Sequence, residues 1–368
     1  MKALVTLLLC MGTLAAAGAQ VVVGQTTGVT GNSALNVGET SLGARLWIDA
    51  VNVHGGVNGN RIELRTLDDQ GNADTAAANV KVLAEKEQVL ALFMIRGTPQ
   101  NQAVLPLLER YDIASIAPST GAMSLYAPVN RHVFNVRSPY QAEAERAIEQ
   151  LASMGNTRIA VFKTHDAFGE DAAAGAMRGF AKAHLEPVLT GSFDKAAPRF
   201  DELALALGKS NAQAVLVLGT GSSVVKATRE IRHAGSKATV VTLSNNASDG
   251  FVRELGEFAR GVIVTQVFPG ESSNTPPMVR DAAALLHTRD PQARLSPAMI
   301  EGFAAARVLV EALRRAGAHP TRKTLLAALD SLESFDLGGV RVHYSASDHS
   351  GVRYTDLSVI DAQGRFRR

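Results

Sequence analysis

The chain alternates short β-branched apolar runs with longer stretches in which apolar residues recur at helical spacing. The short runs predict strands at Val21–Gln25, Arg61–Leu67, Val89–Ile95, Ile113–Ala117, Arg158–Lys163, Val188–Phe193, Ala214–Leu218, Val240–Ser244 and Gly261–Val267. The longer stretches predict helices at Val37–Val53, Thr75–Lys86, Gln100–Tyr111, Gln141–Met154, Asp171–His184, Phe200–Gly208 and Ser223–Ala234. This alternation is typical of βαβ units, in which helices cover both faces of a parallel sheet. We therefore predict an α/β protein.

Two changes in this pattern divide the chain into two lobes. Between Ser119 and Arg131 the apolar residues show no clear period. Val133–Arg137 is predicted as an extended segment that crosses between the lobes, and a new series of strands and helices begins at Gln141. After Val267 the chain is rich in helices, which are predicted at Met278–His287, Pro297–Ala316 and Thr321–Leu332. Two strand-like runs follow, at Val340–Tyr344 and Tyr354–Ile360. We predict two doubly wound lobes, the first formed by residues 20–138 and 267–350 and the second by residues 139–266 and 351–368.

The first nineteen residues have the pattern of a secretory signal peptide. Lys2 precedes an uncharged apolar stretch, and Ala17-Gly18-Ala19 is a small-residue cleavage pattern. A buried N-terminal helix is the alternative, but it leaves the small-residue end unexplained. The bulky Leu9 before Cys10 argues against a lipoprotein signal, so the single cysteine would be lost on cleavage after Ala19. We expect an exported, periplasmic protein without disulfides.

Composition excludes several classes of protein. With 46% hydrophobic and 20% charged residues the chain is expected to fold, and a net charge of +2 argues against binding nucleic acid. Aromatic residues are scarce, at 5%, with the single tryptophan Trp47.

The motifs of common enzyme classes are incomplete. Gly208-Lys209-Ser210 lacks the earlier glycine of a phosphate-binding loop, and Gly219-Thr220-Gly221 lacks the third glycine of a dinucleotide site. The nine histidines form no metal-binding pattern, no Gly-x-Ser-x-Gly motif is present, and Asp68-Asp69 fits turn and capping roles. We therefore predict no catalytic residue, no cofactor and no metal.

Hydroxyl-rich loops follow three predicted strands of the first lobe. Thr98-Pro99 opens a predicted helix with Thr98 as its expected N-cap, and Thr26-Thr27-Gly28 and Pro118–Gly121 follow neighbouring strands. Open α/β sheets bind ligands at this edge, where a helix N-terminus favours an anion. The loops suit a small carboxylate, although ordinary caps and turns are the alternative at any single residue.

The sequence resembles the periplasmic solute-binding proteins of branched-chain amino-acid ABC transporters, the Leu/Ile/Val-binding type. The resemblance covers the whole mature chain and rests on segments that are specific only together, in their order and spacing. They are Asn52-Val53-His54-Gly55-Gly56-Val57-Asn58-Gly59 with Asp68-Asp69, Ala117-Pro118-Ser119-Thr120-Gly121-Ala122, Phe134-Asn135-Val136-Arg137, His165-Asp166-Ala167-Phe168-Gly169-Glu170 and Glu301-Gly302-Phe303.

The resemblance implies a type I periplasmic binding fold, in which two Rossmann-like lobes joined by three crossovers close on a ligand. It implies that Thr98 binds the ligand carboxylate and that Phe168 packs on the ligand from the second lobe. The remaining ligand-binding positions that it implies are Ser119, Thr120, Gly121, Thr220, Gly221, Asn245 and Asn246. Thr220 and Gly221 replace an aromatic contact of the family, and Asn245 and Asn246 stand where amino-acid binders carry an acid for the ligand ammonium.

Because Asn245 and Asn246 stand where the amino-acid binders of the family carry an acid, the ligand class is left open. A desolvated ammonium without a counter-charge costs several kcal/mol. Either Asp166, Asp249 or Glu301 supplies the charge, or the ligand is an aromatic or aliphatic carboxylate or an amide. By resemblance, the protein delivers such a solute to an ABC permease in the inner membrane. A ligand-sensing module for a membrane receptor and an exported α/β enzyme are the alternatives.

Overall fold

The computed structural model describes residues 20–273 and 275–368. The predicted signal peptide, residues 1–19, lies outside the described residues and stays a prediction.

The first lobe is built on a five-stranded parallel sheet. Its strands are β1 (Gln20–Thr27), β2 (Arg61–Asp68), β3 (Ala91–Phe93), β4 (Ser115–Ile116) and β5 (Val133–Phe134), in the order β2-β1-β3-β4-β5. β3, β4 and β5 are buried throughout, as expected for apolar strands covered on both faces.

The second lobe is built on a seven-stranded sheet in the order β14-β13-β10-β9-β8-β6-β7. Its parallel strands are β6 (Ile159–Thr164), β7 (Leu189–Phe193), β8 (Ala214–Leu218), β9 (Thr239–Thr242) and β10 (Ile263–Gln266). The antiparallel strands β13 (Asp356–Ile360) and β14 (Phe366–Arg367) complete one edge. A separate short pair joins β11 (Phe335–Asp336) to β12 (Arg341–Val342).

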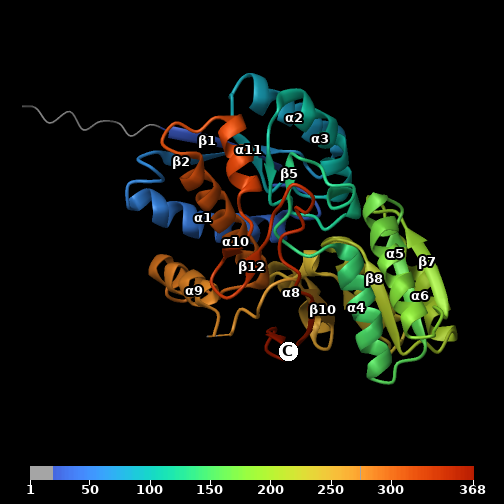
Figure 1. The fold of residues 1–368 in the computed structure, drawn as a ribbon. Coiled ribbons are helices and arrows are strands. Elements are labelled where there is room, and N and C mark those ends of the chain that lie inside the picture. Colours follow the sequence, from blue (N-terminus) through green and yellow to red (C-terminus); the bar gives the residue numbers. More distant parts are fainter. Residues whose placement is uncertain (1–19, 274) are drawn as a thin grey trace, which may run out of the picture.

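Helices cover both faces of each sheet (Figure 1). The first lobe carries α1 (Ala34–Val53), α2 (Ala73–Glu85), α3 (Thr98–Tyr111), α9 (Pro277–Arg289), α10 (Pro297–Ala316) and α11 (Arg322–Asp330). The second carries α4 (Tyr140–Ser153), α5 (Ala167–Lys182), α6 (Asp201–Lys209), α7 (Ser222–His233) and α8 (Asp249–Leu255). The predicted α/β fold with two doubly wound lobes is confirmed.

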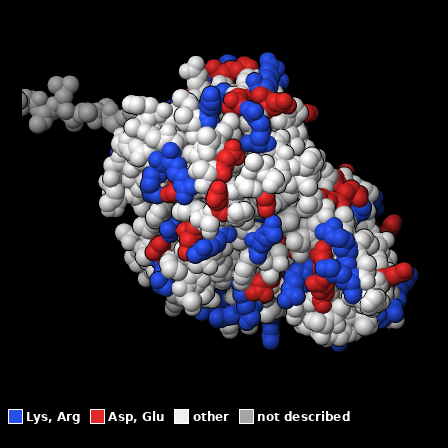
Figure 2. Space-filling model, viewed as in Figure 1, with Lys and Arg blue, Asp and Glu red and all other residues white. Residues whose placement is uncertain are grey.

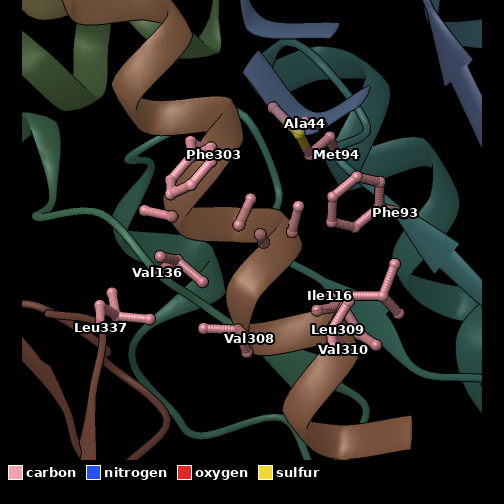
Figure 3. Close-up of a cluster of buried hydrophobic side chains, with 14 of the residues drawn as sticks. Ala44, Phe93, Met94, Ile116, Val136, Phe303, Val308, Leu309, Val310 and Leu337 are labelled. Atoms are coloured by element: carbon pink, nitrogen blue, oxygen red, sulfur yellow. The ribbon is translucent and has the colours of Figure 1, made fainter. Parts of the chain in front are cut away.

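Helix α10 forms the centre of the first core although it is far from β1–β5 in the sequence. Its Phe303, Val308 and Leu309 side chains lie in one buried cluster with residues of α1 and of the first sheet (Figure 3). A Cβ at Gly302 would lie 1.8 Å from the Thr40 carbonyl oxygen, so this glycine allows α1 and α10 to pack backbone against backbone. The chain thus returns to the first lobe after β10.

The segments that cross between the lobes lie side by side. Asn135 N–H donates to the His349 carbonyl (3.0 Å), and Val352 N–H donates to the Val136 carbonyl (3.1 Å). The Ser138 hydroxyl donates to the Val352 carbonyl at 3.0 Å. These bonds join the crossing after β5 to the crossing before β13. The residue limits given above for the lobes remain a prediction.

Among the α-helices and β-strands of the described residues, α8, β11 and β14 were not predicted. Each has only two to seven residues, too few to show a clear hydrophobic period. Both signs of charge are interspersed over the face of the molecule in Figure 2, in line with the near-zero net charge.

Candidate functional site: a cavity between the lobes

A cavity of about 540 Å³ lies between the lobes and is lined from both. The first lobe contributes the segments that follow β1, β2 and β3, and the second contributes those that follow β6, β7 and β8, together with Tyr140 at the start of α4. In each sheet the lining loops flank the point where the strand order reverses, between β1 and β3 and between β6 and β8. Open α/β sheets bind their ligands at such positions.

The first turn of α3 forms one wall of the cavity. Gly97 is the N-cap, with a φ of 96°, and Thr98 is the first helical residue. The prediction that Thr98 is the N-cap is therefore wrong by one position, because glycine adopts this left-handed conformation readily. Gln100, in the same turn, is buried, and its Oε1 has no hydrogen-bond partner among the described residues. The unpaired N–H groups of a helix start and this side chain offer polar contacts to a ligand.

Arg96 lies beside this turn and was not predicted as a site residue. Arg96 is 6% exposed, and its guanidinium donates to the Ser119 hydroxyl (3.3 Å), to the Asn245 carbonyl (2.9 Å) and to the Asn36 side chain. Burial lowers the pKa of Arg96. No ion pair within 4.0 Å joins it to a carboxylate of the described residues. Arg96 lies three residues after the end of β3, and no pattern local to it marks it as a site residue.

The opposite wall combines an aromatic pair with polar side chains. The rings of Tyr140 and Phe168 meet edge to face, with their centroids 4.9 Å apart. Asp166 caps α5, since its Oδ1 accepts from Gly169 N–H (3.0 Å) and from the Thr164 hydroxyl (2.7 Å). His165, Asp194, Lys195 and Thr220 are further polar residues of this wall. The cavity can therefore hold an apolar body against Phe168 and an anionic head beside Arg96.

Three of the predicted binding residues line this cavity: Thr98, Phe168 and Thr220. The Thr220 hydroxyl is buried and has no partner among the described residues. Three others lie behind the first wall. The Thr120 hydroxyl is 2.9 Å from that of Thr98, the Ser119 hydroxyl donates to Glu301 at 3.2 Å, and Gly121 packs against the backbone of Tyr140.

The other three predicted residues, Gly221, Asn245 and Asn246, line a neighbouring hollow of about 10 Å³, which Arg96 also borders. The Asn245 and Asn246 amides both donate to the Gly219 carbonyl, at 3.1 and 3.0 Å, and Asn246 Oδ1 accepts from Gly221 N–H at 2.7 Å. These amides thus bond largely to the chain itself. Their role in ligand binding, like that of all nine predicted residues, remains a prediction.

The three acids considered as partners of a ligand ammonium lie in different places. Asp166 lines the cavity. Asp249 lies at the start of α8, 3.5 Å from Arg294, and Glu301 lies behind Ser119. Among these three, Asp166 alone borders the cavity.

A buried charge network supports the first wall from behind. Arg137 is fully buried and donates to Glu143 at 2.6 Å and to Glu301 at 3.4 Å. Burial acts to lower the pKa of Arg137, but the charges of Glu301 and Glu143 outweigh it and hold the pKa above its ordinary value. Glu143 also accepts from Ser244 N–H at 3.0 Å. The network therefore ties the crossing after β5 to α10 and to the segment after β9.

In residues 20–273 and 275–368, no group of three or more His, Cys, Asp or Glu side chains is arranged to hold a metal ion. Nor does any helix in these ranges have the length and apolar character needed to cross a membrane.

Comparison with known proteins gives consistent results. Residues 20–365 match the profile of a family described as periplasmic binding protein. A Leu/Ile/Val-binding protein homolog of Brucella melitensis biotype 1 is 23% identical over 328 residues, which cover 87% of this chain and 85% of that relative.

Solved structures share the fold. A substrate-binding periplasmic protein from Ralstonia solanacearum has a TM-score of 0.88 and 28% identity, covering 95% of this chain and 99% of that one. An ABC-transporter solute-binding protein from R. palustris in complex with benzoate has a TM-score of 0.84, covering 94% of both chains. At 16% identity the second likeness shows the fold alone.

Proposed function

This chain belongs to the periplasmic binding protein family, and we propose that it captures a small organic solute and delivers it to an ABC importer. Proteins of this family and the solved neighbours are binding proteins rather than enzymes, which confirms the prediction of a non-enzymatic role. The family places the protein outside the cytoplasm. Within this proposal, the predicted signal peptide directs it to the periplasm, and the partner is the permease of an importer.

The observation that carries the proposal is the cavity itself. Both lobes line it, and beside the start of a helix it holds an arginine that has no carboxylate within 4.0 Å in residues 20–273 and 275–368. A ligand carboxylate placed there would face Arg96, Thr98 and the first turn of α3. Hydrogen bonds to charged groups contribute about 1.5–3 kcal/mol each. A few such hydrogen bonds, together with apolar burial against Phe168, supply the binding free energy of roughly 8.2 kcal/mol that a micromolar dissociation constant requires.

The ligand class proposed here is a small carboxylate, with or without an α-ammonium. The name of the Brucella melitensis relative supports branched-chain amino acids, whereas the benzoate complex supports a carboxylate without an ammonium. The cavity of about 540 Å³ has room for either.

A ligand screen tests the proposal. We expect at least one member of a panel of amino acids, aliphatic acids and aromatic acids to raise the melting temperature and to bind by calorimetry. Mass spectrometry of small molecules released from freshly purified, denatured protein would identify a ligand that copurifies. If no small organic acid or amino acid stabilises the protein and none copurifies, the proposed function is wrong.

A further inference from the structure

Lys195 is a cation on the second wall of the cavity. It lies in the loop after β7, lines the cavity and is partly buried. Within the described part of the chain, its ammonium makes no hydrogen bond and has no carboxylate within 4.0 Å. The backbone of the loop is anchored, because the Asn32 amide of the first lobe donates to the Lys195 carbonyl at 3.4 Å.

The charge of Lys195 is coupled to the other charges of the cavity. Burial lowers the pKa of its ammonium, as does the positive charge of Arg96, whereas the carboxylates of Asp166 and Asp69 raise it. Lys195 and Asp166 also border the same cavity. Arg96 lines the cavity on the first wall and Asp166 and Lys195 line it on the second, whereas Asp69 is not among the lining residues.

The acids that line the cavity decide which ligand fits. Lys195 already acts on Asp166, whereas the guanidinium of Arg96 has no carboxylate within 4.0 Å in the described part of the chain and can face a ligand carboxylate. The other acid in the lining, Asp194, is exposed and accepts from Ala196 N–H at 2.7 Å. An amino acid whose carboxylate faced Arg96 would bring its ammonium to Asp166, where Lys195 already supplies a positive charge. Like charges in such a partly desolvated site repel more strongly than in water.

We propose that Lys195 is a specificity-determining residue that takes the place of an α-ammonium beside Asp166, so that the site selects monocarboxylates without an ammonium. This inference rests on the proposed function and names the ligand class for the same cavity. It also accounts for the amides at Asn245 and Asn246, because a ligand without an ammonium needs no acid at those positions.

Calorimetry with matched pairs of ligands tests the inference. The probes are 4-methylpentanoate and leucine, 3-methylbutanoate and valine, and 3-phenylpropanoate and phenylalanine, which differ within each pair only by the α-ammonium. For the wild type we expect the acid to bind at least about tenfold more tightly than its amino acid in the pair that binds best. In Lys195→Met we expect this preference to fall by at least about tenfold, since Asp166 is then uncompensated.

Lys237→Met is the matched control, because Lys237 is exposed on the second lobe and is not among the residues lining the cavity. It should keep the wild-type preference. A merely structural role of Lys195 would weaken both members of a pair equally, so an unchanged ratio in Lys195→Met overturns the inference. So does tighter binding of the amino acids by the wild type, although the proposed function then stands. Binding of no probe, together with a failed ligand screen, overturns both.

Discussion

At the scale of single residues, the Thr98 hydroxyl connects the cavity to the loop behind it. It lies 2.9 Å from the Thr120 hydroxyl, and Thr98 lines the cavity at the start of α3. We expect Thr98→Ala to lower the affinity for the best carboxylate by about tenfold or more, because a desolvated anion loses a hydrogen-bond donor. Calorimetry measures this, with Thr288→Ala on the exposed end of α9 as control. An unchanged dissociation constant would remove Thr98 from the site.

Arg137 stabilises the fold behind the site because it compensates two buried carboxylates. Glu143 and Glu301 both accept from its guanidinium. Arg137→Met leaves both acids without their counter-charge, so we expect the free energy of unfolding to fall by about 3–5 kcal/mol. Denaturant titration measures this change.

Arg353→Met is the control for Arg137→Met. Arg353 is 79% exposed and pairs with Asp348 at 2.8 Å, and such a surface pair contributes only about 0–1 kcal/mol. Equal losses of stability in the two variants would show that the buried network contributes no more than a surface ion pair.

The sequence pattern located the wall residues that follow recognisable signals. Thr98 follows a strand and precedes a proline, Phe168 belongs to a segment that resembles a known family, and Thr220 stands where that family has an aromatic contact. Arg96 and Lys195 were missed for a physical reason. A charged residue after a strand is usually solvated, and only the packing of the second lobe against the first encloses these two side chains. Their importance depends on contacts between distant parts of the chain, which no local pattern encodes.

At the scale of elements, the strands and long helices were predictable and their ends less so. β8 spans Ala214–Leu218 and α10 spans Pro297–Ala316, both as predicted, because buried parallel strands and long amphipathic helices have strong periods. α8 has seven residues and begins with a Ser248 side-chain cap. Its N-terminus is held by Glu39 of the other lobe, which accepts from Asp249 N–H at 3.0 Å and from Gly250 N–H at 2.7 Å. A helix defined by such a contact was not apparent from its own sequence.

The start of α7 limits how closely the lobes approach. Gly221, its N-cap, has a φ of 49°, and a Cβ there would lie 1.9 Å from the Asn32 carbonyl oxygen of the first lobe. We expect Gly221→Ala to prevent this approach and to lower ligand affinity by about tenfold or more. Calorimetry with the best-binding acid measures the effect.

Gly235 provides the matched control for Gly221. It follows the other end of α7 with a φ of 76°, and a Cβ there would meet no atom within 4 Å. Alanine at either position costs about 1–3 kcal/mol of backbone strain, but only Gly221→Ala adds a clash between the lobes. Equal ligand affinities in the two variants would show that this contact does not limit closure.

At the scale of the whole molecule, the lobes are held together by contacts that opening would break. Met123 N–H of the first lobe donates to Asp171 Oδ1 of the second at 3.1 Å, in addition to the Glu39 contact with α8. Beside the cavity, Arg96 donates to the Asn245 carbonyl of the second lobe at 2.9 Å, and the Asn32 amide donates to the Lys195 carbonyl at 3.4 Å. An anion that faces Arg96 and also contacts the second wall would add attraction between the lobes, and ligand binding would thereby favour the closed arrangement.

Small-angle scattering tests this coupling between ligand and shape. A compact chain of this length has a radius of gyration of about 20 Å, and we expect the ligand-free protein to exceed its ligand-bound value because the lobes separate when the anion is absent. The best-binding acid should reduce the radius of the wild type and of Gly235→Ala. Gly221→Ala should keep the larger radius even at ligand concentrations that saturate its site, because the added Cβ meets the Asn32 carbonyl. If saturating ligand leaves the wild-type radius unchanged, binding is not coupled to closure.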